Sequence, residues 1–187
     1  MREDAGMGNT ANELIDTALQ AAATSLAAPG DWLTGEQRRA AAHEALDART
    51  NELDAKRRQA ISPNAVAGQH QATDTLPALA VEVLHRIASD PGRLTRGWAD
   101  QAIAALGEET YTELVGVAAC SAVIDTFAWA MQDTEPALGP AQDGLPANER
   151  PEGVGDVGAW VSQSTASGMA NVSRSLSLVP VTNAAWV

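Results

Sequence analysis

The sequence predicts an all-α protein, with about five to six helices packed as a bundle and an extended arm at the C-terminal end. Alanine is frequent and runs of β-branched residues are rare, a composition that favours helices packed through small side chains. Helix start and stop signals recur along the first two thirds of the chain, and no strand-like alternation accompanies them. The 187 residues, 45% of them hydrophobic, are enough to build one core.

Capping signals predict the first two helices. Thr10 is followed three residues later by a glutamate, which is the capping-box spacing, and the helix that it opens ends before the Pro-Gly pair at 29–30. Thr34 is followed by a glutamine at the same spacing. A highly charged helix is therefore predicted from Thr34 to about residue 60, where a Ser-Pro pair stops it.

Three further helices follow. The first begins near Pro77, carries an apolar stripe with helical periodicity and ends at Asp90. The second is capped by Thr95 and stopped by Gly107. The third, residues 108–132, is apolar almost all round, so we expect it to be the buried centre of the bundle.

The composition changes after this helix, which divides the chain into a helical domain, residues 1–132, and an arm or linker, residues 133–187. The second segment is rich in Pro, Gly, Ser, Asn and Asp, and we expect little regular structure in it. Its scattered apolar residues need a neighbour to cover them. We therefore expect the arm to wrap around another subunit or to lead to another domain.

Charge and cysteine content exclude several classes of protein. The net charge of −12 would repel DNA or RNA, so nucleic acid is not an expected partner. The N-terminal residues lack the pattern of a signal peptide, and polar residues interrupt the longest apolar stretch, residues 114–131. We therefore expect a cytoplasmic protein that does not span a membrane. Cys120 is the only cysteine, which excludes an internal disulfide, and it is expected to fill space in the core.

Four residues are candidate metal ligands. Glu82 and His85 form a Glu-x-x-His pair on one face of a predicted helix, a pattern that holds non-haem iron or manganese in helical bundles. His70, on the preceding loop, supplies another nitrogen. Glu113 lies on the most apolar helix, where an acid is costly unless it is paired or ligated. Without a metal, His70, Glu82 and His85 could instead form a hydrogen-bonded proton relay, and single Glu-x-x-His pairs also arise by chance.

A longer stretch carries a family resemblance. Residues 76–131, "LPALAVEVLHRIASDPGRLTRGWADQAIAALGEETYTELVGVAACSAVIDTFAWAM", resemble the alkylhydroperoxidase-like (carboxymuconolactone decarboxylase-like) superfamily. "AISPNAV", with His70 just beyond it, is similar to the segment that follows the Cys-x-x-Cys of a peroxidase-related branch. The resemblance covers roughly residues 33–132, and the tail "NVSRSLSLVPVTNAAWV" looks like the linker to a second such domain in tandem members. The resemblance implies an all-α fold that assembles into trimers or hexamers. It also implies a Cys-x-x-Cys dithiol whose protons are relayed by a nearby His and Glu.

This chain departs from the family pattern at the dithiol itself. When the family pattern is aligned at the Ser-Pro pair, its two cysteine positions correspond to Asn51 and Asp54. Neither residue can form a thiolate or a disulfide. One interpretation is that both are solvated helix positions. The other is a repurposed pocket, in which Asp54 acts as an acid/base group or a metal ligand.

Two main functions remain open. The first is a structural or partner-dependent subunit of a peroxidase-type assembly, either a homo-oligomer or paired with a sister chain that bears Cys-x-x-Cys. The second is a cysteine-independent enzyme that acts on a small organic substrate through His70, Glu82 and His85, aided by Asp54 or Glu113, with or without a transition metal. A small-ligand binding module is a weaker third possibility.

A few other side chains have expected places. Asp125 is expected to pair with Arg93 or Arg96. Trp98 and Trp129 are expected in the core or at subunit contacts. His43 lies in the charged helix and is expected at the surface.

Overall fold

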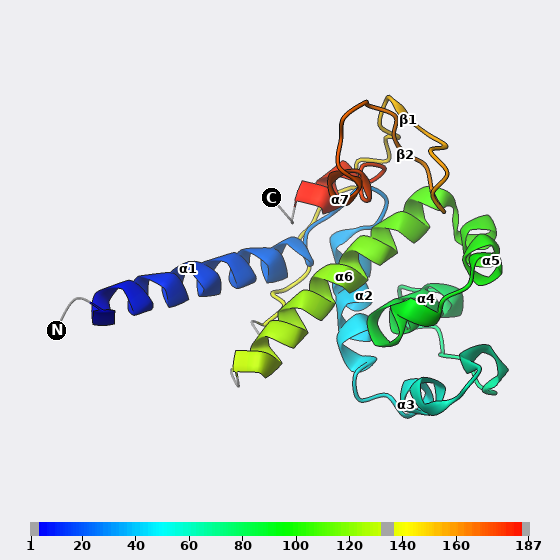
Figure 1. Cartoon of the computed structure of the whole chain (residues 1–187), viewed down its shortest axis with the longest axis horizontal. Helices are drawn as coiled ribbons and strands as arrows, with labels where there is room; N and C mark the ends of the chain where they lie inside the picture. Colours follow the sequence, from blue (N-terminus) through cyan, green and yellow to red (C-terminus); the bar gives the residue numbers. More distant parts are fainter. Residues whose placement is uncertain (1–3, 132–136, 185–187) are drawn as a thin grey trace.

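A computed structural model of the chain confirms the all-α class (Figure 1). The structure describes the backbone of residues 4–131 and 137–184, and the side chains from residue 13 onward. The helices are α1 (Asp4–Ser25), α2 (Gly35–Asp47), α3 (Glu52–Gln59), α4 (Ala78–Ser89), α5 (Arg96–Leu106), α6 (Glu108–Met131), α7 (Asn171–Arg174) and α8 (Pro180–Asn183). Two single 3₁₀ turns, Pro63–Ala65 and Pro91–Arg93, flank α4, and β1 (Val154–Gly155) pairs antiparallel with β2 (Gln163–Ser164).

Helix α6 is the centre of the bundle, as its apolar sequence predicts. It packs along both α2 and α4, and it also contacts α1, α5 and α8 (Figure 1). The core where these helices meet is built from small and branched side chains, which include Leu26, Ala41, Ala42, Val83, Leu84, Leu114, Val117 and Ile124. Alanines on α2 let the helix backbones approach closely, which explains the alanine-rich composition.

Helix α6 is also the one helix of the described chain that is long and apolar enough to cross a membrane, by length and composition only. In the 18-residue apolar window of this helix, 44% of the residues are buried inside the protein. The core helix of a soluble protein passes the same test, so this is weak evidence for a membrane span.

Several predicted helix ends are confirmed. Thr34 forms the capping box with Gln37, Thr95 accepts a hydrogen bond from the amide of Trp98, and Gly107 ends α5 with a φ of +87°. A left-handed φ is costly for any residue with a Cβ, which is why a glycine stops this helix. The predicted start of the first helix at Thr10 is wrong, because α1 begins at Asp4.

The predicted helix from Thr34 to residue 60 is also wrong, because the chain breaks it in two. Helix α2 ends at Asp47, and a turn at 48–51 leads to Asn51, which begins α3 as its N-cap. The Asn51 side chain accepts a hydrogen bond from the amide of Leu53 (2.9 Å). An asparagine that bonds the backbone in this way competes with a continuous helix. The break changes the direction of the chain, so that α3 lies below α4 (Figure 1).

The C-terminal arm, residues 137–184, packs on the helices of its own chain. Its backbone bonds the loop after α1, where the Asn148 amide donates to the Asp31 carbonyl (2.7 Å). Near its end, Leu178 and Val179 are fully buried. The rest of this chain covers these two residues, whereas Leu145 and Val172 are 88% and 81% exposed, so the expectation that another subunit or domain covers the arm stays a prediction.

Candidate functional site

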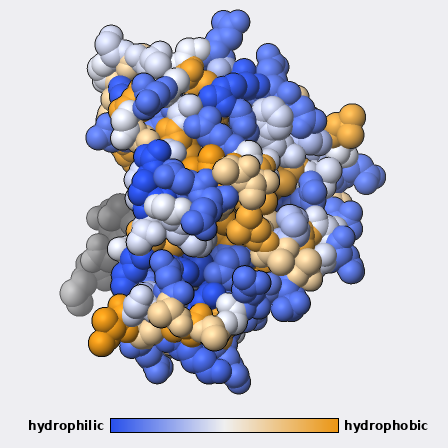
Figure 2. Space-filling view, turned by 90° about the vertical axis from the view of Figure 1, so that its right-hand side faces the viewer, coloured by the Kyte–Doolittle hydropathy of each residue, from blue (hydrophilic) through white to orange (hydrophobic). Residues whose placement is uncertain are grey.

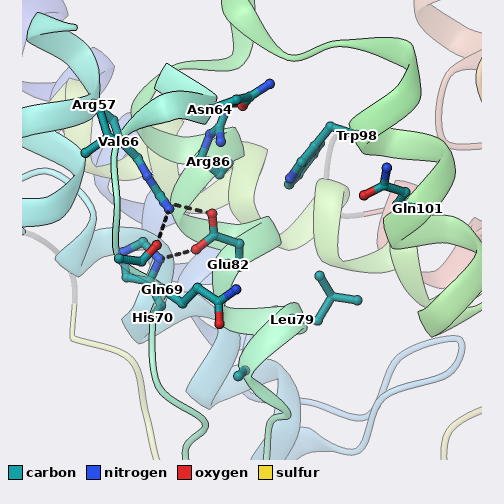
Figure 3. A pocket seen from close by; sticks show the side chains of 12 residues that line it. Arg57, Asn64, Val66, Gln69, His70, Leu79, Glu82, Arg86, Trp98 and Gln101 are labelled. Carbon is teal, nitrogen blue, oxygen red and sulfur yellow. Dashed lines mark hydrogen bonds and ion pairs between the residues drawn. The ribbon is translucent and has the colours of Figure 1, made fainter. Parts of the chain in front are cut away.

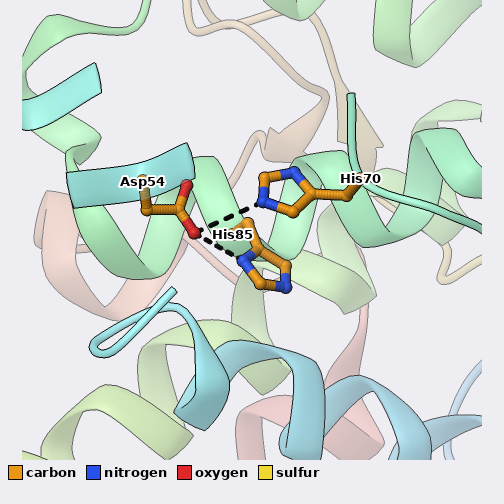
Figure 4. A group of neighbouring side chains, drawn as sticks. All are labelled: Asp54, His70 and His85. Atoms are coloured by element: carbon orange, nitrogen blue, oxygen red, sulfur yellow. Dashed lines mark hydrogen bonds and ion pairs between the residues drawn. The ribbon is translucent and has the colours of Figure 1, made fainter. Parts of the chain in front are cut away.

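Three side chains from different segments meet inside the bundle (Figure 4). Asp54 comes from α3, His70 from the loop before α4, and His85 from α4, and all three are buried. The Asp54 Oδ2 lies 2.6 Å from His85 Nδ1 and 3.4 Å from His70 Nε2. The two imidazole rings stack, with centroids 3.8 Å apart and planes 24° apart. The expectation of a solvated Asp54 is therefore wrong, because its carboxylate is completely buried between two histidines.

Two more carboxylates extend this cluster in opposite directions. Glu82 Oε2 lies 2.8 Å from His70 Nδ1, and Glu44 Oε2 lies 3.1 Å from His85 Nε2. The result is a continuous chain of contacts that we call the relay, in the order Glu82, His70, Asp54, His85, Glu44. The Glu44 side chain is 26% exposed, so this end of the relay reaches solvent.

The break between α2 and α3 places Asp54 in this cluster. Because Asn51 is the N-cap of α3, Asp54 lies in the first turn of the helix. A carboxylate there is favoured by the helix dipole, typically by about 0.3–1 kcal/mol. Glu82 and His85, three residues apart on α4, do not contact each other, because each bonds a different histidine or carboxylate of the relay.

The charges of the relay stabilise one another. Burial alone would lower the pKa of His70, but its contacts with Asp54 and Glu82 raise that pKa to about 9. Burial would raise the pKa of both carboxyls, but the histidines hold the pKa of Asp54 well below its usual range. His70 and Arg57 likewise lower the pKa of Glu82. At neutral pH, His70 is therefore an imidazolium held between two carboxylates.

A pocket of about 490 Å³ opens beside Glu82 (Figure 3). Glu82 lies at its centre, with Arg57 and His70 on one side and Trp98 on the other. Arg57 Nη1 is 2.7 Å from Glu82 Oε1, and Arg57 Nη2 donates to the carbonyl of Gly68 (3.1 Å). Both oxygens of Glu82 are thus held, one by a guanidinium and one by an imidazolium.

The surface around this pocket is mainly hydrophilic. Figure 2 shows the side of the molecule that carries α3, α4 and α5, where polar groups surround a band of apolar atoms. The pocket combines both kinds of surface, because it has charged groups on its floor and Leu79 and Trp98 in its wall. A small molecule with a polar end and an apolar body fits such a lining.

Within the part of the chain that the structure describes, Asp54, His70 and His85 form a group whose ligand atoms lie close enough together to hold a metal ion. Two histidines and a carboxylate are suitable ligands for iron or manganese. Ligands of one ion, each about 2.1 Å from it, are separated by about 3 Å or more. The 2.6 Å contact between His85 and Asp54 is shorter, and stacked rings direct their nitrogen lone pairs side by side rather than to one point. The His85–Asp54 and His70–Glu82 contacts are hydrogen bonds, whereas His70 Nε2 lies 3.4 Å from Asp54 Oδ2 as a charge contact without a hydrogen bond. The two short bonds favour the proton relay over a metal site.

Glu113, the fourth expected metal ligand, does not belong to this cluster. It accepts hydrogen bonds from Arg38 Nη1 (2.6 Å) and from the amides of Trp32 and Leu33. Arg38 Nη1 also donates to the hydroxyl of Thr182 on the arm (2.7 Å). Burial raises the pKa of Glu113, although Arg38 acts in the opposite direction. The buried acid is thus satisfied by an arginine and two amides, and its role here is to join α6, α2 and the arm.

Other expected contacts also differ in the structure. Asp125 pairs with Arg49 (2.7 Å) instead of Arg93 or Arg96, because the start of the turn after α2 brings Arg49 next to α6. Arg93 binds backbone carbonyls of α3 and the carboxylate of Asp90, and Arg96 pairs with Asp100.

The aromatic and sulfur expectations have mixed outcomes. Trp98 lies in the wall of the pocket and is half-buried, while Trp129 is 68% exposed and so lies outside the core. Cys120 is buried on α6 with no disulfide, as a core residue would be, and burial raises the pKa of its thiol. His43 is exposed, as expected.

Arg57, Glu44 and Arg86 are parts of the site that sequence reasoning missed. Arg57 follows Asp54 by three residues, so their shared helix face was a usable signal. Glu44 had no signal beyond membership of a charged helix. No family model, curated protein or solved structure matches the chain. The geometry of the site is therefore the basis for assigning a function.

Proposed function

We propose that this protein is a cysteine-independent enzyme that transfers protons to or from a small organic molecule bound beside Glu82. The observation that carries the proposal is the buried pair of Glu82 and His70, with its imidazole–carboxylate hydrogen bond of 2.8 Å at the wall of a pocket. Titratable groups in a pocket whose pKa values are shifted by specific charged partners are candidates for acid–base chemistry. Here the pKa of His70 is raised and that of Glu82 is lowered.

At neutral pH the pair is arranged to donate a proton. His70 carries the proton on Nδ1, which bonds Glu82 Oε2. The raised pKa of His70 and the lowered pKa of Glu82 oppose complete transfer along this bond, so the substrate takes the proton from Glu82 in the same step in which His70 gives one up. Isomerisation and decarboxylation both need such a step, in which a carbon atom gains a proton.

The relay offers a route by which His70 regains its proton. Beyond His70 lie Asp54, His85 and then Glu44, whose side chain reaches solvent on another side of the cluster. A proton from solvent enters at Glu44 and the vacancy at His70 is filled through the two intervening groups. The pocket and the proton supply thus lie on different sides of the cluster.

We also propose that the scaffold is of the alkylhydroperoxidase-like type. The support lies in Asn51 and Asp54, the two places that the resemblance assigns to the dithiol. Asn51 caps α3 and Asp54 lies in its first turn, facing His70. The N-terminus of a helix is the setting that lowers the pKa of catalytic thiols. On this proposal a carboxylate has replaced a thiol in a site that retained its His/Glu relay.

Exposed apolar side chains favour a second candidate, the subunit of a larger assembly. Val123, Trp129 and Met131 on α6 are 51–68% exposed, and Leu14 on α1 is 67% exposed. Such residues are common at subunit interfaces. On this proposal the chain forms trimers or hexamers, or joins a Cys-x-x-Cys-bearing sister. Light scattering of the purified protein tests the homo-oligomer, and a strictly monomeric protein that captures no such sister would contradict both forms.

Proton exchange into small organic acids tests the enzyme directly. The protein is incubated in D₂O with a panel of such acids, and deuterium incorporation at carbon is followed by NMR. We expect exchange with at least one compound, reduced about 10²-fold or more in Glu82→Gln and in His70→Gln. His43→Gln, a change at an exposed histidine outside the relay, is the matched control and should exchange at the native rate. Equal exchange in Glu82→Gln and native protein would disprove the assignment.

A further inference from the structure

Arg86 is a buried cation without a carboxylate partner among the described residues. It lies in the last turn of α4, in the lining of the pocket, and is only 3% exposed. Its Nη2 donates to the side-chain oxygen of Asn64 (2.9 Å), while its Nε has no hydrogen-bond partner. Each other arginine described at the site, such as Arg57, bonds a carboxylate or several carbonyls.

The natural partner of Arg86 is already occupied. Glu82 precedes Arg86 by four residues on α4, the spacing and order at which a glutamate and an arginine pair best on a helix. Its two oxygens are instead bonded by Arg57 (2.7 Å) and His70 (2.8 Å). Both oxygens of Glu82 are therefore occupied, and Arg86 is left without a direct ion pair among the described residues.

A buried guanidinium that has no direct ion pair lowers the stability of the folded protein. A buried charge without a counter-ion destabilises a structure unless a further group compensates it. Burial and then the nearby positive charge of Arg57 lower the pKa of Arg86, and the carboxylates of Glu82, Asp90 and Asp54, which form no direct ion pair with it, offset this only in part. An anion that enters the pocket would supply the missing partner.

The surroundings of Arg86 also indicate what kind of anion fits. The guanidinium lies over the ring of Trp98, 5.4 Å from its centroid. Trp98 and Leu79 form an apolar wall beside Glu82 (Figure 3). A flat ring such as tryptophan stacks well on a planar, unsaturated group. An inorganic anion would leave this wall without a contact.

We propose that Arg86 binds the carboxylate of a small organic acid whose planar body lies against Trp98. The inference rests on the proposed function, since the same pocket serves both. Glu82 and Arg86 are four residues apart on α4, a rise of about 6 Å along the helix. An acid anchored at Arg86 therefore presents to Glu82 an atom that lies a few bonds from its carboxylate.

Calorimetric titration with benzoate and benzamide tests the binding site. The two probes have nearly the same shape, but only benzoate carries a charge. We expect the native protein to bind benzoate at least about tenfold more tightly than benzamide, and Arg86→Met to lose this preference. Arg96→Met is the matched control, because Arg96 is an exposed arginine outside the pocket, and it should keep the native preference.

Thermal unfolding of the same variants separates binding from structure. A buried cation that binds a ligand is expected to destabilise the protein while no ligand is bound. The variant Arg86→Met should therefore unfold at the native temperature or above it. A clear decrease would identify Arg86 as a structural residue and overturn the proposal. So would equal affinity for benzoate and benzamide, no binding of either at about 20 mM, or inorganic phosphate binding as tightly as benzoate.

The two proposals can fail separately. Benzoate binding needs no turnover, so it reports on Arg86 whether or not proton exchange occurs. If Arg86-dependent binding is found but Glu82→Gln exchanges protons at the native rate, the acid site stands and the proton-transfer role of Glu82 does not.

Discussion

At the scale of single residues, His70 and His85 have stacked rings but different surroundings. His85 lies between Asp54 and Glu44, and His70 lies between Asp54 and Glu82. Asp54 Oδ2 contacts both rings, so one carboxylate oxygen couples the two histidines. Glu82 lines the pocket and bonds His70, so the charge of His70 affects the group that faces a ligand in the pocket.

The raised pKa of His70 predicts a loss of stability at alkaline pH. Its folded-state pKa is about 9, against 6.5 for the free side chain, so the folded state binds the proton more tightly. This contribution is complete below pH 6.5 and disappears as the pH rises through 9, where folded and unfolded states both become neutral. Denaturant unfolding from pH 6 to 10 should therefore show the free energy of unfolding falling through this window, by up to about 3 kcal/mol.

The variant His70→Gln serves as the reference for this measurement. It keeps a polar side chain near Glu82 and Asp54 but cannot carry the proton. Its stability should vary less than the native stability between pH 6.5 and 9. NMR titration of the His70 ring gives the same information directly, and a midpoint near 6.5 would show that the carboxylates do not hold the proton.

At the scale of elements, the decisive feature is the break between α2 and α3. Asn51 ends the turn and caps α3, which sets the helix register and so the face on which Asp54 and Arg57 lie. Both of these residues face the site: Asp54 contacts His70 and His85, and Arg57 pairs with Glu82. A short helix of eight residues has few other interactions to hold it in this register.

Replacing the cap should weaken the helix and the site together. Asn51→Ala removes the acceptor for the Leu53 amide and should lower the free energy of unfolding by about 1 kcal/mol. Asn51→Asp keeps a capping oxygen and should retain most of the native stability. Urea unfolding measures both. If the two variants lose equal stability, the capping bond is not what holds α3.

At the scale of the whole molecule, the arm closes the bundle at the end opposite the relay. Asp31, in the loop after α1, accepts hydrogen bonds from the amides of Val181 and Thr182 and from the Thr182 hydroxyl (2.8–2.9 Å). The same hydroxyl accepts a bond from Arg38, which pairs with Glu113. One buried network therefore joins the first loop, two core helices and the last described helix.

Breaking this network should cost more than an ordinary surface change. Asp31→Ala leaves two amides and a hydroxyl of the arm without their acceptor, so we expect a loss of about 2–4 kcal/mol in the free energy of unfolding. Asp156→Ala is the control, since Asp156 is an exposed arm residue that accepts a bond from the Gly158 amide. Its loss should stay within about 0.5 kcal/mol. Similar losses in both variants, measured by urea unfolding, would mean that the arm is not clamped at Asp31.

Local signals in the sequence determined the helix class and most helix ends. Thr34, Thr95 and Gly107 act through bonds to residues three or four positions away, and the apolar pattern of residues 108–131 alone indicates a central helix. His70, Glu82 and His85 could be chosen because histidines are rare in this chain and one of them follows a glutamate at helical spacing. These features depend on neighbours along the chain, which a sequence displays directly.

Only the tertiary structure decided which charged groups meet. Asp54 is buried because a turn at 48–51 rotates α3 toward His70, and Glu113 is kept from the relay by Arg38. Arg86 forms no ion pair with a described carboxylate because Arg57, from another helix, binds the glutamate beside it. In each case the stabilising interaction joins residues that are distant in sequence. A charged side chain pairs with the group that the folded chain places next to it. Helix signals are local, whereas ion pairs in a buried site are a property of the packed molecule.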